Sequence, residues 1–243
     1  MRIPAACTGI FTLRPSAGRF TTQRCRSGLA GQEAVQSVNG PMAKTLEDII
    51  MYSKAIIDAK PWLVDPKMLP IPWRQAEPKT KLKIAVLWND GICRPTPPVQ
   101  RALKETSEKL KKAGHEIIEW DPKLHRTALD QLGRMFVADG GKSVEALLAP
   151  TGEPYRPEMQ TYAESKELGV FDMWKLQLDR SELQRQYLEQ WTSVGGLDAI
   201  LGGLFTLECT NGYLTQHSTN YPVCKRAARP LQICWVHWSL QRR

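Results

Sequence analysis

The stretch Leu82-Lys83-Ile84-Ala85-Val86-Leu87-Trp88 decides the fold of this 243-residue chain. Its continuous apolar centre predicts a β-strand that is buried on both faces, which is typical of parallel sheets. Pro97 and Pro98 follow where a helix can begin, because proline suits the first helical turn, and Gly114 is a natural end for that helix. The stretch from His115 to Trp120 alternates and predicts the next strand. Strand, helix and strand together predict a βαβ unit with parallel strands and a right-handed crossover.

On the C-terminal side of this unit, the sequence predicts further helices and a third strand. The predicted helices are Ala128 to Ala138, Lys142 to Leu148 and Phe171 to Thr192, and the predicted strand is Leu197 to Leu201. The longest of these helices has five candidate core residues, which are Trp174, Leu178, Leu183, Tyr187 and Trp191. Strands that alternate with helices define the α/β class, so we expect an α/β protein.

On the N-terminal side, residues 1–42 are rich in Gly, Pro, Ser and Thr and predict loops and short strands. Thr45, with Asp48 three residues later, is a variant capping box and predicts the start of a helix that Lys60-Pro61 ends. The apolar face expected for this helix consists of Leu46, Ile49, Ile50, Ile56 and Ile57.

The composition is that of an ordinary globular protein, with 42% hydrophobic and 24% charged residues. This excludes collagen-like, mucin-like and fully disordered chains. The longest nearly uncharged apolar stretch, Val194 to Leu207, is shorter than the roughly 18–20 residues needed to span a bilayer. The first residues lack the apolar core of a signal peptide, so a cytoplasmic protein is expected, with its six cysteines as free thiols.

Residues 208–243 differ in character from the rest of the chain. The formal net charge is +8, and residues 209–243 hold five basic residues and no acid, which leaves +3 for the first 208 residues. The basic residues near Trp235 and Trp238 could contact a nucleic acid, but their density is low, and a solvated tail is the preferred interpretation. Five residues there could ligate zinc, although their spacing matches no common site: Cys209, His217, Cys224, Cys234 and His237.

Motifs of the common enzyme classes are absent from the sequence: there is no Walker loop, GxGxxG, HExxH or GxSxG. His115 and His125 have no Ser, Cys or Asp at a spacing that marks a catalytic triad, and both are expected at the surface. Taken alone, these patterns predict an α/β protein and indicate no activity.

Two segments near the N-terminus carry a resemblance to a family. Arg2-Ile3-Pro4-Ala5-Ala6-Cys7-Thr8-Gly9-Ile10-Phe11-Thr12-Leu13-Arg14-Pro15-Ser16-Ala17-Gly18-Arg19 and Val38-Asn39-Gly40-Pro41-Met42-Ala43-Lys44-Thr45-Leu46-Glu47-Asp48 resemble consecutive segments of the amidase signature family. Residues 58–74 look like its fungal acetamidase-type branch, and residues 82–201 fit its order of elements. Beyond about residue 202 the chain resembles nothing in the family.

The resemblance implies hydrolysis of carboxylic amides to a carboxylate and ammonia or an amine. It implies a serine nucleophile in a Gly-Gly-Ser motif, a second serine and a proton-relaying lysine, which together form and hydrolyse an acyl-enzyme. The family's nucleophile lies immediately before the position that matches Met1, so none of these groups maps onto residues 1–243. No residue of this chain is therefore assigned a catalytic, cofactor-binding or metal-binding role.

The expected architecture is a partial amidase-type α/β/α core with a mixed sheet, truncated at the N-terminus. Residues 1–207 are predicted to form a partial amidase domain, and residues 208–243 an irregular basic tail that is shifted in reading frame or disordered. The predicted function is that of an amide-hydrolase fragment, inactive alone, without cofactor or membrane partner. Two alternatives stay open: a non-enzymatic protein that pairs with a full-length amidase, and a weak nucleic-acid binder acting through the tail. The expected partners are a small-molecule amide in the full-length family and a second copy of the chain in a homo-oligomer.

Overall fold

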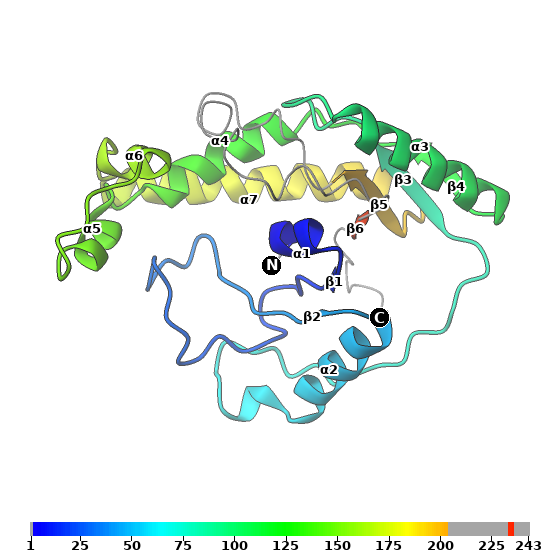
Figure 1. Ribbon diagram of the computed structural model, residues 1–243, viewed down its shortest axis with the longest axis horizontal. Coiled ribbons are helices and arrows are strands. Elements are labelled where there is room, and N and C mark those ends of the chain that lie inside the picture. Colours follow the sequence, from blue (N-terminus) through cyan, green and yellow to red (C-terminus); the bar gives the residue numbers. More distant parts are fainter. Residues whose placement is uncertain (1, 204–232, 236–243) are drawn as a thin grey trace. The chain divides into compact units, whose positions relative to one another are not determined.

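The computed structural model describes residues 2–203 and 233–235 (Figure 1). The chain divides into two compact units. The first unit comprises Met1–Gln23, Val38–Pro122 and Gly196–Arg243, and the second comprises Arg24–Ser37 and Lys123–Gly195. The predicted division at residue 207 stays a prediction, because residues 204–232 and 236–243 lie outside the described residues.

The first unit contains a four-stranded sheet in the order β4-β3-β5-β6. Its strands are β3 (Lys83–Leu87), β4 (Glu116–Glu119), β5 (Ala199–Gly203) and β6 (Ile233–Trp235). The central strand β3 pairs in parallel with both β4 and β5, whereas β6 pairs antiparallel with β5. The sheet is therefore mixed, as the sequence predicted, and β3 is the strand that was expected to be buried on both faces.

The core of this sheet forms where α3 (Pro97–Lys112) packs on one face (Figure 1). Ile84, Val86 and Leu103 are at most 5% exposed and contact one another with Leu201. Ala85, on the opposite face of β3, is 0% exposed. Burial on both faces explains why the β3 sequence is continuously apolar rather than alternating.

Asp198 fixes the start of β5 against the start of β3. Its carboxylate accepts a hydrogen bond from the Lys83 backbone N–H at 2.9 Å and forms an ion pair with Lys79. The Asp198 N–H in turn donates to the Lys83 carbonyl. These contacts fix the register of β3 against β5 at the point where both strands begin.

The N-terminal part of the first unit consists of α1 (Arg2–Thr8) and a ribbon of β1 (Phe11–Thr12) and β2 (Met42–Ala43). The ribbon confirms the predicted short strands, but the prediction of loops for the first residues was wrong over α1. Proline is compatible with a first helical turn, so Pro4 does not prevent the helix. Thr8 stabilises its end by donating its hydroxyl to the Pro4 carbonyl at 2.8 Å.

The helix α2 (Leu46–Asp58) follows the ribbon and begins as the sequence predicted. The Asp48 N–H donates to Oγ1 of Thr45 at 3.1 Å, which confirms the N-terminal cap. The helix ends before Lys60, whose φ of 54° leads into the short 3-10 helix η1 (Pro61–Leu63). The predicted apolar face is only partly correct, because Leu46 and Ile50 are about half exposed.

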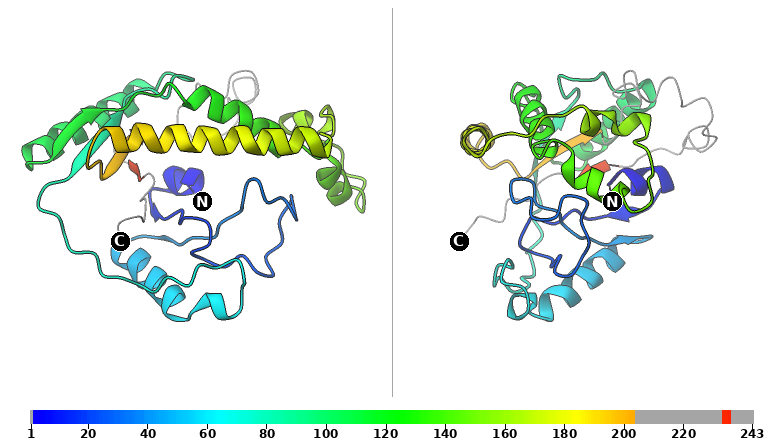
Figure 2. Two further views of the ribbon diagram at one scale, coloured as in Figure 1. Left: turned by 180° about the vertical axis from the view of Figure 1, so that it is seen from behind. Right: turned by 90° about the vertical axis from the view of Figure 1, so that its left-hand side faces the viewer.

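The second unit is helical, with α4 (His125–Phe136) alongside α7 (Val170–Ser193) (Figure 2). The shorter elements are α5 (Lys142–Leu148), η2 (Pro157–Met159) and α6 (Gln160–Ala163). The core contains Ala34, Met135 and Leu176, none of them more than 9% exposed. Three predicted helices are thus confirmed in place.

Two core assignments on α7 were wrong. Trp174 is 67% exposed and Leu178 is 70% exposed, whereas Leu176 is 1% exposed. This helix has apolar residues on two sides, so periodicity alone could not select the side that packs.

Among the described residues, Cys7 is a free thiol, as predicted, and Cys25 forms no disulfide, but Cys93 is disulfide-bonded. The prediction of free thiols was therefore wrong for Cys93, because the approach of two sulfur atoms is a tertiary property. None of the helices in residues 2–203 is long and apolar enough to cross a membrane.

Candidate functional site

The segments that resemble amidase motifs meet at the ribbon. β1 and β2 pair antiparallel, with Phe11 opposite Ala43 and Thr12 opposite Met42. The Pro41 carbonyl accepts the Thr12 hydroxyl at 2.9 Å and the Leu13 N–H at 3.2 Å. The two motif segments are thus held to each other, although 29 residues separate Thr12 from Pro41.

Gly40 permits this close approach. A Cβ at Gly40 would lie 2.0 Å from the Leu13 carbonyl oxygen and 3.0 Å from Pro15. The φ of Gly40 is not positive, so lack of space rather than backbone conformation excludes a side chain here. The Gly-Pro pair of the second motif is therefore explained by packing.

Two arginines of the first motif, Arg14 and Arg19, lie in surroundings that lower their pKa. Burial, and secondarily the positive charge of Arg2, lowers the pKa of Arg14. Burial, and secondarily Arg74, lowers the pKa of Arg19, whose Nη1 donates to the Ile71 carbonyl at 2.7 Å. Arg19 thus links the end of the first motif to Ile71, which follows η1 in the chain.

Asp65 makes a second contact between the segment that follows the first motif and the segment that follows α2. It is 4% exposed, and its carboxylate accepts the Thr21 hydroxyl at 2.5 Å and the Lys67 N–H at 3.0 Å. The hydrogen bond from Thr21, followed by the one from Lys67, lowers the pKa of Asp65. The sequence analysis did not identify this carboxylate, because its partner hydroxyl lies 44 residues away.

The hydrogen bonds that Asp65 accepts predict a pH dependence of stability. Its folded pKa lies below the unfolded value of about 4, so its contribution is complete above about pH 4 and is lost as the pH falls through the folded pKa. Asp65→Asn should therefore lower the free energy of unfolding at pH 7 by roughly 1–2 kcal/mol and flatten its decline below pH 4. Urea unfolding between pH 2.5 and 7 measures both effects. The exposed Asp130→Asn is the control, and an equal flattening there would contradict the assignment.

A second low-pKa carboxylate, Asp139, holds the start of α5. Burial raises its pKa, but the hydrogen bonds from Ser143 and from the Gly141 N–H outweigh that effect and lower it. The Ser143 N–H lies 2.8 Å from Oδ2 of Asp139, and the Gly141 N–H lies 3.0 Å from Oδ1. This is the role of a helix-capping carboxylate, which the sequence could have indicated because Asp139 shortly precedes the predicted helix.

Ser53, His115 and His125 have structural partners. The buried Ser53 hydroxyl donates to the Ile49 carbonyl of its own helix at 2.6 Å. His115 accepts the Leu82 N–H at Nδ1 at 3.3 Å, and His125 stacks on Tyr187 with ring centroids 6.1 Å apart. Burial raises the pKa of Tyr187. None of these groups is arranged as a nucleophile with its base.

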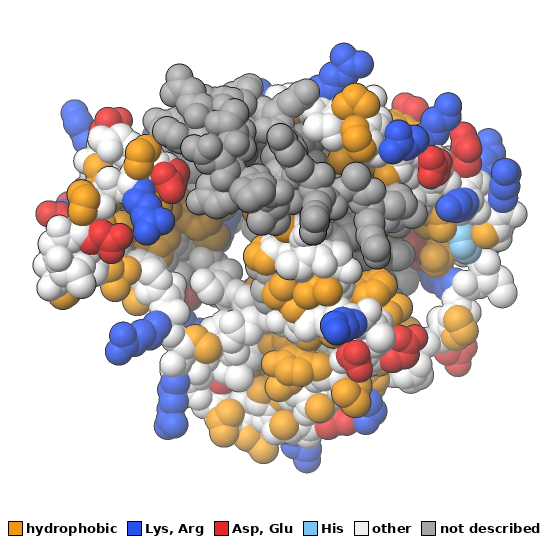
Figure 3. Space-filling model, in the orientation of Figure 1, with side chains coloured by type: hydrophobic (Ala, Val, Ile, Leu, Met, Phe, Trp, Pro, Cys, Tyr) orange, Lys and Arg blue, Asp and Glu red, His pale blue; other side chains and the backbone are white. Residues whose placement is uncertain are grey.

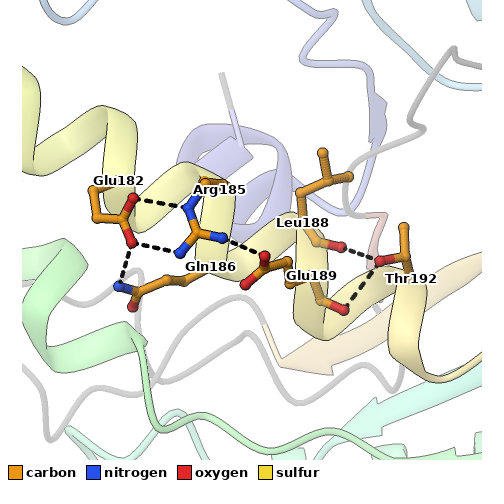
Figure 4. Close-up of polar contacts among 6 residues, drawn as sticks. All are labelled: Glu182, Arg185, Gln186, Leu188, Glu189 and Thr192. Atoms are coloured by element: carbon orange, nitrogen blue, oxygen red, sulfur yellow. Dashed lines mark hydrogen bonds and ion pairs between the residues drawn. The ribbon is translucent and has the colours of Figure 1, made fainter.

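A network of polar side chains lies exposed on α7. Figure 4 shows the Arg185 guanidinium between Glu182 and Glu189, with Gln186 donating to Glu182. Hydrogen bonds from Arg185, and then from Gln186, lower the pKa of Glu182 to about 2. Exposed pairs of this kind stabilise helices weakly, so we assign the network to the helix surface and not to chemistry.

In the part of the chain that the structure describes, no group of three or more His, Cys, Asp or Glu is placed to hold a metal ion. The five residues that were considered for zinc belong to the tail. Their side chains lie outside the described residues.

Comparisons with known proteins agree with the resemblance that the two motif segments carry. The family profile described as Amidase matches residues 1–222. Amidase 1 of Gibberella moniliformis is 34% identical over 198 residues, which are 79% of this chain and 38% of that protein. Acetamidase of Emericella nidulans is 33% identical over 201 residues, which are 79% of this chain and 37% of that protein. The chain belongs to the amidase family.

Solved structures support the same assignment. A fatty acid amide hydrolase is 35% identical and superposes with a TM-score of 0.81, covering 85% of this chain and 37% of that one. A 6-aminohexanoate cyclic dimer hydrolase, at 17% identity and a TM-score of 0.63, shares the fold. The chain therefore spans less than half the length of these relatives. The predicted resemblance and the mixed α/β class are both confirmed.

Proposed function

We propose that residues 1–243 are the scaffold portion of an amide hydrolase that converts a carboxylic amide and water to a carboxylate and ammonia. The observation that supports this most directly is the TM-score of 0.81, at 35% identity, with a fatty acid amide hydrolase. The motif segments joined at the ribbon support it as well, since they are the parts of the chain that resemble the family most closely.

We further propose that the chain by itself does not hydrolyse amides. Its three Gly-Gly pairs are followed by Lys142, Leu197 and Leu204, so the 243 residues contain no Gly-Gly-Ser. The buried Ser53 hydroxyl is engaged within its own helix. Without an activated nucleophile and oxyanion donors, only weak substrate binding remains.

The experiment that tests this compares two proteins. One is the 243-residue chain, and the other carries, ahead of Met1, the part of Acetamidase from Emericella nidulans that precedes its match. Ammonia release from acetamide and an aryl amide is expected only from the fused protein, and Ser→Ala in the supplied Gly-Gly-Ser should abolish it. Turnover by the 243-residue chain that disappears when one of its own serines is replaced would refute the proposal.

A further inference from the structure

A short segment of the connection between β1 and β2 is exposed at every position. It comprises residues 23–28, which we call the arginine loop, and it lies within residues 13–41, which form neither a helix nor a strand. Turns lie on both sides of Cys25, Arg26 and Ser27. Exposed irregular segments of this kind are the places where enzymes that act on folded polypeptides reach the chain.

The arginine loop carries positive charge only. Arg24 and Arg26 are exposed, residues 2–32 contain no Asp or Glu, and the next acid in the chain is Glu33. On the face shown in Figure 3, Lys and Arg side chains protrude in the area where Figure 1 draws the connection from β1 to β2. Within residues 2–203, neither guanidinium takes part in a hydrogen bond or an ion pair. Both can therefore bind carboxylates of another protein, because a guanidinium matches a carboxylate with two parallel hydrogen bonds.

Ser27 is the hydroxyl-bearing residue that these two arginines precede. Arg24 lies three residues before it, and Arg26 lies directly before it. The Ser27 Oγ accepts a hydrogen bond from the Leu29 N–H at 3.3 Å, which is long for a bond of this type. This bond uses one acceptor position of the oxygen and does not use the hydroxyl proton. The hydroxyl is thus exposed and able to donate its proton to an incoming base.

Thr22 provides an internal comparison. Among the serines and threonines of residues 2–203, Ser27 and Thr22 are the two that an arginine precedes by three positions. The arginine before Thr22 is Arg19, whose Nη1 donates to the Ile71 carbonyl at 2.7 Å. Thr22 and Arg19 are also only partly exposed. The hydroxyl and the arginine that precedes it by three residues are therefore both exposed at Ser27, but not at Thr22.

We propose that Ser27 is a phosphorylation site for a protein kinase that selects arginine three residues before and one residue before the serine. Carboxylates in the substrate groove of the kinase bind Arg24 and Arg26. The Ser27 Oγ then attacks the γ-phosphorus of ATP. The bond from Oγ to this phosphorus forms, the bond from the phosphorus to the oxygen shared with the β-phosphate breaks, and ADP leaves. The hydroxyl proton passes to the catalytic aspartate of the kinase.

The surroundings of Ser27 also accommodate the product. A phosphoserine carries a charge of about −1.5 to −2 at neutral pH, so the formal charge of the arginine loop falls from +2 to about zero. The phosphate lies beside Arg24 and Arg26, and no carboxylate of residues 2–32 repels it. Because the side chain is exposed, the phosphate stays in water and is not buried.

The test incubates the folded 243-residue chain with ATP and the catalytic subunit of the cyclic-AMP-dependent protein kinase, which selects serines that follow arginines. Mass spectrometry of peptides measures the initial rate of phosphate incorporation at each serine and threonine. Arg24→Gln should lower the rate at Ser27 by about tenfold or more, because a charge-assisted contact with the kinase is lost. Arg94→Gln, which removes an exposed arginine outside the arginine loop, is the matched control and should change that rate by about twofold or less. Ser27→Ala should abolish the dominant phosphopeptide.

A synthetic peptide of residues 18–36 separates the sequence of the arginine loop from its accessibility. If the peptide accepts phosphate at Ser27 and the folded chain does not, the loop is closed to the kinase and the proposal is overturned. It is also overturned if neither accepts phosphate, because the two arginines are then not recognised. Equal rates at Thr22 and Ser27 in the folded chain would show that exposure does not select the site, and would overturn it as well. Circular dichroism of each variant shows that a lost rate does not come from unfolding.

Discussion

Gly40→Ala is expected to lower the free energy of unfolding by about 3 kcal/mol. An added methyl group would stand 2.0 Å from the Leu13 carbonyl oxygen, and that neighbour is backbone rather than a flexible side chain. Relief of the clash requires the segment with Pro41 to move away from β1, which breaks the contacts of Pro41 with Thr12 and Leu13. Inserting atoms into a closely packed site typically costs 1–3 kcal/mol, and the lost hydrogen bonds add to this cost.

Gly133→Ala is the matched control for this prediction. Gly133 lies inside α4, and a Cβ there meets no atom within 4 Å. Alanine in an exposed helix interior should raise the free energy of unfolding by about 0.5–1 kcal/mol. Urea denaturation at neutral pH measures both variants. If Gly40→Ala lowers the free energy of unfolding by less than about 1 kcal/mol, the segment with Pro41 moves without losing its contacts. Gly40 would then have another role.

Leu176→Ala is expected to lower the free energy of unfolding by about 2–5 kcal/mol. Leu176 is 1% exposed in the core of the second unit, where it contacts Met135 and Ala34. Removing its side chain loses the burial of the apolar atoms and leaves a cavity that the flanking helices can fill only in part.

Leu178→Ala supplies the internal comparison on the same helix. Leu178 is 70% exposed, so its truncation should change the free energy of unfolding by about 0.5 kcal/mol or less. Urea unfolding monitored by helical circular dichroism reports on both variants. Similar losses for the two leucines would mean that the side of α7 that packs in solution differs from the one described.

Local signals predicted the elements whose boundaries depend on neighbouring residues. The cap at Thr45, the prolines that start α3 and the glycine that ends it each act over three or four positions, so their outcome can be derived from the chain itself. The helix α1 was missed because the density of Gly and Pro around it outweighed its short helical stretch, although a proline in the first turn is permitted.

The assignment of α7 residues to the core failed for a different reason. The helix is apolar on two sides, and the packed side contains Leu176 while Trp174 and Leu178 point away. Helical periodicity gives the angle between residues, but the side that is buried depends on which other helix lies beside it. The same limitation applies to Leu46 and Ile50 on α2.

The sequence identified the two motif segments but assigned no site residue, and the tertiary structure supplied the physical reasons for the pairing of these segments. The sequence indicated that the Gly-Pro pair precedes a capped helix, but only the structure showed that Gly40 faces the Leu13 carbonyl. Asp65 had no local signal, because its pKa is set by a hydroxyl 44 residues away.

The sequence by itself determined the family, the βαβ order and the helix caps, because each follows from residues a few positions apart or from a motif in one segment. Only the tertiary structure decided which sides of α2 and α7 are buried, how the two motif segments join at the ribbon, and which carboxylates have a lowered pKa. These features depend on contacts between residues far apart in the chain, and such contacts form when apolar surface is removed from water by a neighbour that local patterns do not specify.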